Sequence, residues 1–325
     1  MNIGITGANG HIGANLTRIL LKQGYQIKVL DYNDTKGIEG LDVTKVKGNL
    51  NDPGSLDRLC EDVDVLYHLA AYISIGNESY DLLHKVNVEG TQNLVRAAKK
   101  AGVKRLVYFS TIHVLDHHPL DQPLDETRPL VTDSPQAYER TKSIVEKWIL
   151  TQHSDDFEIV IINPTAVVGP DDYKPSLMGQ MLLKLYKGKL PFLVPGGYNW
   201  VDVRDVAAAS ANALTKGRSG ESYILSGGWH SLKEIAYVME QGTGKKIRSI
   251  ILPYRMAYIG VPFIKMWSAL TRQKPLYTKE SLDIIRQANK NIRNDKARKE
   301  LDYSPRPFSE TITDTMNWFK ENKYI

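Results

Sequence analysis

A phenol and an ammonium group stand four residues apart in the segment Tyr138-Glu139-Arg140-Thr141-Lys142. On a helix, side chains with this spacing share one face. A phenol whose pKa has its ordinary value of about 10 is a poor base at neutral pH. A neighbouring lysine cation stabilises the phenolate and so lowers that pKa. The spacing therefore predicts that Tyr138 gives or takes a proton and that Lys142 tunes it.

Two hydroxyl side chains, Ser110 and Thr111, close an apolar run that we expect to be a strand over 103–110. Ligands bind at the carboxyl ends of strands in open α/β sheets, so a hydroxyl there can polarise a substrate oxygen beside Tyr138. The polar connection over 112–135 is long, and connections of that length usually carry function. We expect it to border the substrate pocket, with His113 as a pocket-lining or solvated residue or, alternatively, a second acid or base.

The elements that must position these groups follow an alternating pattern through the first half of the chain. Apolar spacing and flanking turn residues predict strands over 3–6, 26–31, 43–50, 63–70, 103–110 and 158–163. Between them, helices are predicted over 11–23, 53–61, 78–100 and 136–153. Short strands separated by helices indicate a parallel sheet covered on both faces, that is, an α/β Rossmann fold with a doubly wound sheet.

The alternation loosens after residue 168. An amphipathic segment over 177–186, a strand–helix unit over 201–214 and a strand over 222–225 precede a mainly helical remainder. We therefore predict a nucleotide-binding domain made of 1–168 plus about 199–225. A smaller, mainly helical substrate-binding lobe is predicted from 169–198 and 226–325.

A glycine-rich turn, Thr6-Gly7-Ala8-Asn9-Gly10-His11-Ile12-Gly13, comes directly after the first predicted strand. Gly7 can take the positive φ of a tight turn, and Gly10 lets backbone N–H groups approach an anion. Gly13 allows close packing of helix on strand, and the helix N-terminus faces the phosphate charge. A strand, a glycine turn and a helix start in this order predict a pyrophosphate-binding loop for a dinucleotide.

Asp31 ends the second predicted strand, where a carboxylate can accept hydrogen bonds from both ribose hydroxyls of an adenosine. It would repel a 2′-phosphate, which favours NAD over NADP, although Lys36 nearby could soften the discrimination. Asn49 and Leu50 follow the third strand and could hold adenine, while the small Ala70 and Ala71 leave room for the pyrophosphate and ribose. The predicted cofactor-binding set is Gly7, Asn9, Gly10, His11, Ile12, Gly13, Asp31, Asn49, Leu50, Leu69, Ala70, Ala71, Asn87, Tyr138, Lys142, Pro164 and Val167.

Together, these motifs resemble the extended short-chain dehydrogenase/reductase superfamily. The resemblance covers essentially the whole chain and rests on the glycine turn, Asp31, Ser110-Thr111 and Tyr138-x-x-x-Lys142, together with the runs at 87–91, 163–170 and 201–207. It implies a Rossmann domain, bound NAD(P), and Thr111, Tyr138 and Lys142 as catalytic residues. It also implies a homodimer formed through the two long helices that hold 87–100 and 138–150.

The resemblance leaves the substrate open. Sugar-nucleotide members usually carry Arg-x-x-Asn before the Gly-Pro that follows the sixth strand, and this chain has Asn163 and Ala166 there. They often carry Arg-Asp before a later strand, where the nearest residues here are Tyr198 and Asn199. A buried diphosphate without such donors would be poorly compensated. The run from Asn163 to Pro170 looks more like relatives of dihydroflavonol-4-reductase and 3β-hydroxysteroid dehydrogenase. Thr111, His113 and Asn163 are the predicted substrate contacts.

Composition excludes several other classes of function. The 325 residues are 42% hydrophobic and 24% charged with a net charge of +5, which is ordinary for a globular enzyme. The basic run over 286–299 has no interleaved aromatic residues, so we expect a solvated helix face and no nucleic-acid partner. No carboxylate pair or Cys/His cluster has metal-ligand spacing, and His68 is predicted to be a satisfied core histidine. The single cysteine, Cys60, fits a reducing compartment, and with no signal peptide visible a cytoplasmic location is expected.

The apolar segment over 254–270 is interrupted by Arg255, Gly260, Pro262 and Lys265, so no membrane span is expected. The segment could lie on a membrane surface or on a partner subunit, but burial over a substrate cleft is the default expectation.

Three functions compete at this stage. The first is an NAD(P)-dependent oxidoreductase that transfers a hydride between the cofactor and a secondary alcohol or carbonyl of a small organic substrate. The second is a sugar or nucleotide-sugar epimerase that oxidises and re-reduces its substrate with the same three residues. The third is a non-catalytic NAD-binding sensor, against which the intact Thr111, Tyr138 and Lys142 argue.

Overall fold

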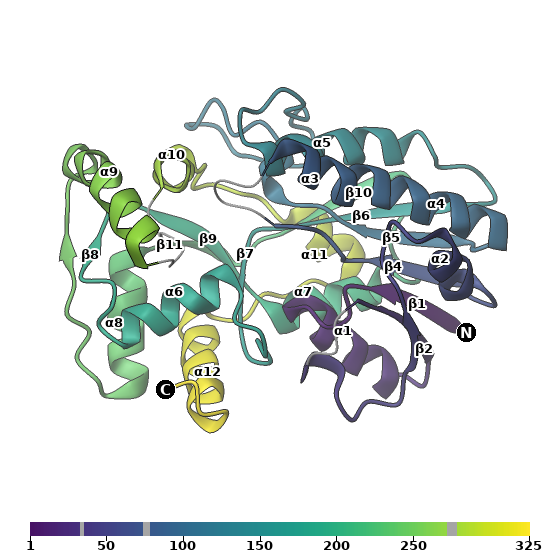
Figure 1. Cartoon of the computed structure of the whole chain (residues 1–325), viewed down its shortest axis with the longest axis horizontal. Coiled ribbons are helices and arrows are strands. Elements are labelled where there is room, and N and C mark those ends of the chain that lie inside the picture. The colour runs from purple at the N-terminus through teal and green to yellow at the C-terminus, as the bar shows by residue number, and fades with distance from the viewer. Residues whose placement is uncertain (33–35, 74–78, 272–277) are drawn as a thin grey trace.

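The computed structural model describes residues 1–32, 36–73, 79–271 and 278–325 (Figure 1). Within them, seven strands form one parallel sheet in the order β10-β6-β5-β4-β1-β2-β3. The strands are β1 (Asn2–Thr6), β2 (Gln26–Asp31), β3 (Thr44–Lys47), β4 (Val65–His68), β5 (Arg105–Phe109), β6 (Glu158–Pro164) and β10 (Glu221–Leu225). The order runs outward from β1 in both directions, which confirms the predicted doubly wound Rossmann fold.

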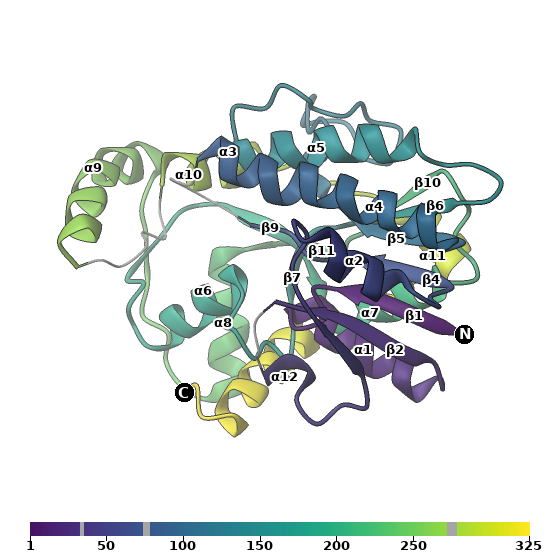
Figure 2. The same ribbon diagram turned by 45° about the vertical axis from the view of Figure 1, so that its right-hand side comes forward.

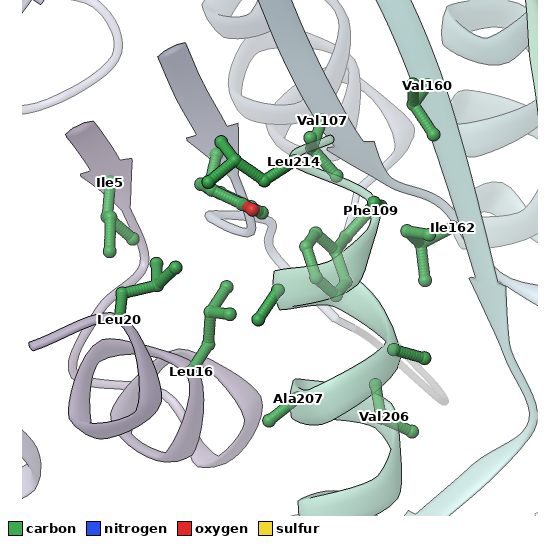
Figure 3. Packing of buried hydrophobic residues seen from close by; sticks show 14 of the residues in the cluster. Ile5, Leu16, Leu20, Val107, Phe109, Val160, Ile162, Val206, Ala207 and Leu214 are labelled. Carbon is green, nitrogen blue, oxygen red and sulfur yellow. The ribbon is translucent and has the colours of Figure 1, made fainter. Parts of the chain in front are cut away.

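Helices cover both faces of this sheet, as Figures 1 and 2 show. One face carries α1 (His11–Lys22), α7 (Val203–Asn212) and α11 (Asp295–Leu301), and the other carries α2 (Pro53–Cys60), α4 (Gly90–Ala101) and α5 (Ala137–Leu150). Val107 and Phe109 of β5 point toward α1 and α7 (Figure 3). Leu106 and Tyr108 pack in the other cluster, with α4 and α5. Because side chains alternate across a strand, this strand is apolar at nearly every position.

The predicted boundaries need three corrections. The strand expected over 43–50 ends at Lys47, because Asn49 forms a turn with the backbone N–H of Asn51 and Asp52 then caps α2. The helix expected over 78–100 is α3 (Tyr80–Leu83), a π-helical stretch (His84–Glu89) and α4, and residue 78 lies outside the described residues. In the unit expected over 201–214, only residues 201 and 202 belong to a strand. The Asp202 side chain accepts the N–H of Arg204, and α7 begins at Val203.

The remaining elements form a smaller lobe with a core of its own. Its sheets are β7 (Ala166–Val168), β9 (Gly197–Asp202) and β11 (Gly228–Ser231), and the pair β8 (Phe192–Leu193) and β12 (Ile250–Ile251). Its helices are α6 (Leu177–Tyr186), α8 (Leu232–Thr243), α9 (Tyr254–Thr271), α10 (Lys279–Gln287) and α12 (Phe308–Glu321). In both views, α6, α8 and α9 lie away from the N-terminus. Among the described residues, no helix is long and apolar enough to cross a membrane.

The predicted division of the chain into two domains stays a prediction. β10 completes the large sheet and α7 packs on it, as the first domain requires. However, β9, which the prediction placed mostly with the nucleotide-binding domain, pairs with β7 and β11 in the smaller sheet. The chain therefore crosses between the two lobes at Asp202, where β9 ends and α7 begins.

Candidate active site

The predicted site residues come together along one edge of the large sheet. β1, β4, β5 and β6 are parallel, so their carboxyl ends at Thr6, His68, Phe109 and Pro164 lie at the same edge. The strand order changes direction between β1 and β4. A crevice at such a switch point is the usual ligand site of an open α/β sheet.

The glycine turn after β1 has no room for side chains at two positions. Gly7 has φ +77°, and a Cβ there would lie 2.6 Å from the backbone nitrogen of Ala70. A Cβ on Gly13 would lie 2.2 Å from the carbonyl oxygen of Gly7. α1 begins at His11, directly after this turn, and its first N–H groups have no acceptor within the helix. The turn and the helix N-terminus thus fit a pyrophosphate group.

Asp31 is held beside the same turn. Its side chain is 4% exposed, and its Oδ1 accepts a hydrogen bond of 2.9 Å from the Asn9 amide. Gly37 packs against Asn9 so closely that a Cβ would lie 2.7 Å from the Asn9 carbonyl oxygen. This position fits a carboxylate that recognises ribose hydroxyls and disfavours a 2′-phosphate.

A continuous line of hydrogen bonds fixes the backbone opposite the glycine turn. The N–H of Ala70 donates to Thr6 Oγ1 (3.3 Å), and Thr6 in turn donates to His68 Nδ1 (2.6 Å). His68 Nε2 donates to Thr91 (2.8 Å), whose hydroxyl donates to the Asn87 carbonyl (2.6 Å). These directions require a neutral His68, and burial lowers the pKa of His68 to about 3. The prediction of a satisfied core histidine is confirmed, and the sequence did not show its part in this line.

Two predicted cofactor contacts are engaged with other protein groups. The Asn87 amide bonds both backbone groups of Tyr72 (2.8 and 3.1 Å) and the Thr141 hydroxyl on α5 (3.2 Å). Leu50 is buried, and a Cβ built on Gly90 of α4 would lie 2.8 Å from the Cβ of Leu50. Asn87 thus supports the segment after β4, while contacts of Asn87, Asn49 and Leu50 with the cofactor stay predictions.

The three residues predicted to do chemistry lie on β5's carboxyl end and on α5. Thr111 follows β5 and is 8% exposed, and its Oγ1 accepts the N–H of His113 (3.4 Å). Tyr138 and Lys142 belong to α5, and Tyr138 is partly exposed. Lys142 Nζ donates to the carbonyl of Phe109 (2.6 Å), the last residue of β5, and lies 4.2 Å from the centre of the Tyr108 ring. α5 therefore brings the phenol and the ammonium group to the end of the strand that carries Thr111.

Glu146, which the sequence reasoning missed, completes this arrangement. It stands one turn beyond Lys142 on α5 and is 2% exposed. Its Oε2 accepts a hydrogen bond of 3.0 Å from Asn163 of β6, and the same Asn163 nitrogen donates to the Thr111 carbonyl (3.2 Å). The repeated four-residue spacing Tyr138, Lys142, Glu146 was the signal that could have found it.

The electrostatics of this cluster are set mainly by burial. Burial lowers the pKa of the Lys142 ammonium to about 7, while the negative charge of Glu146 raises it. Burial raises the pKa of Glu146, and Asn163, Ser110 and the charge of Lys142 act in the other direction. Burial and the neighbouring Glu139 raise the pKa of Tyr138, so Lys142 does not lower this pKa as the four-residue spacing predicted. The phenol is protonated at neutral pH and is able to donate.

The predicted substrate contacts differ in their surroundings. His113 is partly exposed, and its Nδ1 lies 3.8 Å from Glu139, which is itself next to Tyr138. Burial lowers the pKa of His113 to about 4, so the ring is neutral at pH 7. Asn163 is 1% exposed, and its amide nitrogen already has two acceptors within the protein. A substrate contact is therefore easier to reconcile with His113 than with Asn163, and both stay predictions.

The His11 side chain points away from the glycine turn toward the smaller lobe. Its Nε2 donates to the carbonyls of Gly169 (3.1 Å) and Pro170 (2.9 Å). On the same helix, Arg18 contacts the Tyr173 hydroxyl (3.1 Å) and lies 5.2 Å from the centre of its ring. Helix α1 is thus tied to the segment that connects β7 to α6.

Pro164 and Val167 lie beyond β5 on the same edge, at the end of β6 and in β7. Within the described parts of the chain, no three His, Cys, Asp or Glu side chains are grouped to hold a metal ion.

Comparison with known proteins gives a consistent assignment. Residues 3–226 match the model of the NAD dependent epimerase/dehydratase family. The chain is 32% identical to sterol demethylase protein B of Methylococcus capsulatus, over 99% of both chains. It is 31% identical to a putative dihydroflavonol 4-reductase of Synechocystis, over 99% of this chain and 95% of the other.

Solved structures show the same fold. The crystal structure of gox2253 superposes with a TM-score of 0.85 at 32% identity, covering 100% of this chain and 99% of that one. A UDP-glucuronic acid 4-epimerase from Bacillus cereus, crystallised with its nucleotide sugar and NAD, gives 0.77 at 20% identity over 99% and 100% of the two chains.

Proposed function

We propose that this chain reduces or oxidises a small apolar substrate at a carbonyl or secondary alcohol. The chain belongs to the NAD-dependent epimerase/dehydratase family and is an NAD-dependent enzyme of the short-chain dehydrogenase/reductase type. The observation that carries this proposal is the grouping of Thr111, Tyr138 and Lys142 at the carboxyl end of β5. Bound NAD would supply or accept the hydride. The residues of this chain manage the proton and the position of the substrate.

In the proposed reaction, Thr111 and Tyr138 hold the substrate oxygen between their hydroxyl groups. Tyr138 donates its phenolic proton to that oxygen during reduction and takes it back during oxidation. Lys142 stabilises the phenolate by its charge, and its hydrogen bond to Phe109 keeps the ammonium group at the end of β5. The Gly7–Gly13 turn, Asp31 and the segment after β4 would hold the cofactor, because they form a backbone cradle that excludes side chains.

Two positions argue for an apolar substrate in place of a nucleotide sugar. Tyr198 packs edge-on against Trp200 at 5.4 Å, and the Asn199 amide donates to the Asn289 carbonyl (2.8 Å). Asn163, at the position of the arginine usual in sugar-nucleotide members, is buried between Thr111 and Glu146. These side chains are uncharged and already contact other protein groups, so none of them offers a positive charge to a diphosphate. The proteins with 31–32% identity include two whose names refer to sterol or flavonoid substrates.

The alternative proposal is an NAD-dependent epimerase acting on a sugar or nucleotide sugar. Structures named as epimerases share the fold, and the same three residues would serve both half-reactions. An epimerase turns over without net NADH consumption, whereas a reductase consumes one NADH per carbonyl. A thermal-shift panel of NAD⁺, NADP⁺, sugar nucleotides and apolar ketones, followed by NADH absorbance with each binder, separates the two.

The Tyr138→Phe variant tests the mechanism on whichever ketone the panel identifies. We expect kcat to fall by about two to four orders of magnitude because the proton donor is gone. NADH affinity should stay within about threefold, since the variant keeps the ring. Unchanged turnover by Tyr138→Phe would falsify the proposed role, and a sugar nucleotide as the only binder would favour the epimerase.

We also propose that the chain acts as a cytoplasmic homodimer that pairs through α4 and α5. Support comes from Ile144 and Trp148, which lie one turn apart on α5 and are only partly buried. The free thiol of Cys60 is buried and fits a reducing compartment.

A further inference from the structure

A group of apolar side chains is exposed on β8, β12 and the first turns of α9. Figure 1 shows β8 and α9 at the end of the smaller lobe. Ile259 is 69% exposed and Ile250 is 62% exposed, and the set comprises Phe192, Ile250, Ile251, Met256 and Ile259. Phe192 and Ile250 are direct neighbours, because they pair in the parallel register of β8 and β12. We refer to these five residues as the apolar tip. The burial expected for this part of 254–270 is therefore wrong for Met256 and Ile259.

The chain around the apolar tip is basic and contains no acidic residue. The sequence over 173–201 and 241–279 has no Asp or Glu. Apart from Lys174, Lys265 and Lys279, the lysines and arginines of the described structure in these two segments are Lys184, Lys187, Lys189, Lys245, Lys246, Arg248 and Arg255. Lys184 and Lys189 are close together, because the N–H of Lys189 donates to the Lys184 carbonyl (2.8 Å), and burial and the charge of Lys189 both lower the pKa of Lys184.

Two contacts describe how this basic surface is built. Lys245 lies 4.1 Å from the centre of the Tyr186 ring, which joins the loop before β12 to the end of α6. On a neighbouring element, Asp283 of α10 accepts the Tyr258 hydroxyl and so is already engaged. Across the described residues, no ion pair involves Lys246, Arg248 or Arg255.

Charge decides between the possible partners of the apolar tip. A second copy of this chain docking tip to tip would bring the two basic surfaces together, which is unfavourable at physiological salt. An anionic bilayer offers an apolar interior and negative headgroups at the same surface. Protruding isoleucine, methionine and phenylalanine side chains surrounded by lysine and arginine are the composition expected of a protein that rests on such a surface.

We propose that the apolar tip docks on the surface of an anionic lipid bilayer. The five apolar side chains enter the interfacial region, and the surrounding lysines and arginines contact headgroup phosphates. The helix α9 lies on the bilayer and does not cross it. This inference is independent of the proposed reaction, because it rests on a surface that contains none of the residues of the candidate active site.

Co-flotation with lipid vesicles tests the proposal on the full chain. Vesicles of phosphatidylcholine with about 30% phosphatidylglycerol, the order of anionic lipid content of a charged membrane, are compared with vesicles of phosphatidylcholine alone. We expect binding to the anionic vesicles at low salt, at least about tenfold weaker binding to the neutral ones, and release as salt rises.

Two variants separate the apolar and the electrostatic parts. Lys246→Glu with Arg248→Glu should weaken binding by about tenfold or more, because these exposed side chains have no ion-pair partner in the described chain. The matched control is Lys22→Glu with Lys299→Glu, which changes the net charge equally on α1 and α11, and it should bind nearly as wild type. Ile250→Ser with Ile259→Ser should also weaken binding, while far-UV circular dichroism and Tm stay as in wild type.

Three results would overturn the inference. The first is no flotation with anionic vesicles at low salt. The second is an equal loss of binding in the control on α1 and α11, which would show that net charge alone is responsible. The third is a wild-type oligomer, seen by sedimentation, that Ile250→Ser with Ile259→Ser dissociates, because the tip would then be a protein interface.

Discussion

A buried carboxylate next to a buried ammonium group is the least expected feature of the candidate active site at the residue scale. Glu146 and Lys142 are 2% and 3% exposed, and removing one member of such a pair leaves the other uncompensated. Each keeps polar partners of its own: Lys142 has the Phe109 carbonyl and Glu146 has the Asn163 amide. In the proposed reaction, Glu146 acts through Lys142 and Asn163 as a positioning residue.

The Glu146→Gln variant should change the pH dependence of the enzyme. The charge of Glu146 raises the pKa of Lys142, so its removal lowers that pKa below the value of about 7. Since reduction needs the Lys142 cation, kcat/KM falls as pH rises through this pKa. The fall should therefore begin at lower pH in the variant, and activity at pH 8 should be about tenfold lower.

The measurement is kcat/KM for carbonyl reduction between pH 5.5 and 9. Glutamine keeps an oxygen for Asn163, so the KM for NADH should change little, whereas Tm should fall because Lys142 loses a buried opposite charge. A variant whose basic limb coincides with that of wild type would show that Glu146 has no electrostatic influence on Lys142.

Sequence reasoning located the groups proposed to act directly and missed those that contact them. Thr111, Tyr138 and Lys142 stand in short motifs, and the structure brings them to one strand end. The line from Thr6 through His68 to Thr91 joins residues far apart in the chain, so no local spacing announces it. Asn163 was assigned to the substrate because of its motif position, whereas its partners on α5 and after β5 become visible only when the strands are placed side by side.

At the scale of elements, the turn between β1 and α1 depends on the absence of a side chain at Gly13. A Cβ there would lie 2.2 Å from the Gly7 carbonyl oxygen, and backbone cannot yield as a flexible side chain can. Gly13→Ala should therefore destabilise the fold by about 1–3 kcal/mol and lower NAD affinity at least about tenfold.

Gly260 provides the matched control for Gly13→Ala. It also lies inside a helix, α9, but a Cβ there would meet nothing within 4 Å. Gly260→Ala should leave NAD affinity unchanged and stabilise the protein by up to about 1 kcal/mol. Thermal unfolding and calorimetric titration with NAD measure both effects. Equal NAD affinity in Gly13→Ala and wild type would contradict the close approach at the turn.

The elements that the sequence predicted well are those with long apolar periodicity. All six strands expected in the first half exist, and β1, β4, β5 and β6 are continuous, almost fully buried runs flanked by turn residues, whereas β3 at the sheet edge is mostly exposed. The π-helical stretch His84–Glu89 was read as ordinary helix, since the two forms differ in backbone pairing and not in residue type. The two-residue strands β8 and β12 are too short to show alternation, so only their pairing across the lobe reveals them.

At the scale of the whole molecule, charged contacts join the C-terminal helix to the large sheet. Arg204 of α7 pairs with Asp202 and with Asp314 of α12, each at 2.7 Å. Arg306, just before α12, pairs with Asp205 of α7 at 2.7 Å. Side chains from both lobes thus fix the lobe boundary at Asp202. Ion pairs between residues so far apart in the chain could not be predicted from local sequence patterns.

The proposed dimer gives a prediction at the same scale. Trp148 is partly exposed on α5, so Trp148→Glu places a charge in the proposed interface and should shift the protein from dimer to monomer. Tyr237→Glu is the matched control, because Tyr237 is a 62% exposed aromatic residue on α8 of the smaller lobe. Sedimentation velocity at micromolar concentration reports the mass of each. A monomeric wild type, or equal dissociation of both variants, would argue against pairing through α4 and α5.

The contacts of α1 with the segment after β7 have a thermodynamic consequence. His11 and Arg18 stand on the helix whose first turn is proposed to face the cofactor phosphates, and their side chains contact residues 169–173, which lead into the smaller lobe. A substrate that displaces this segment must also disturb the cofactor helix, so occupancy of one site changes the free energy of filling the other. Linkage is reciprocal, and the cofactor must then alter substrate affinity by the same factor. Helix α1 would therefore couple the affinities of the two sites by one factor, whichever ligand binds first.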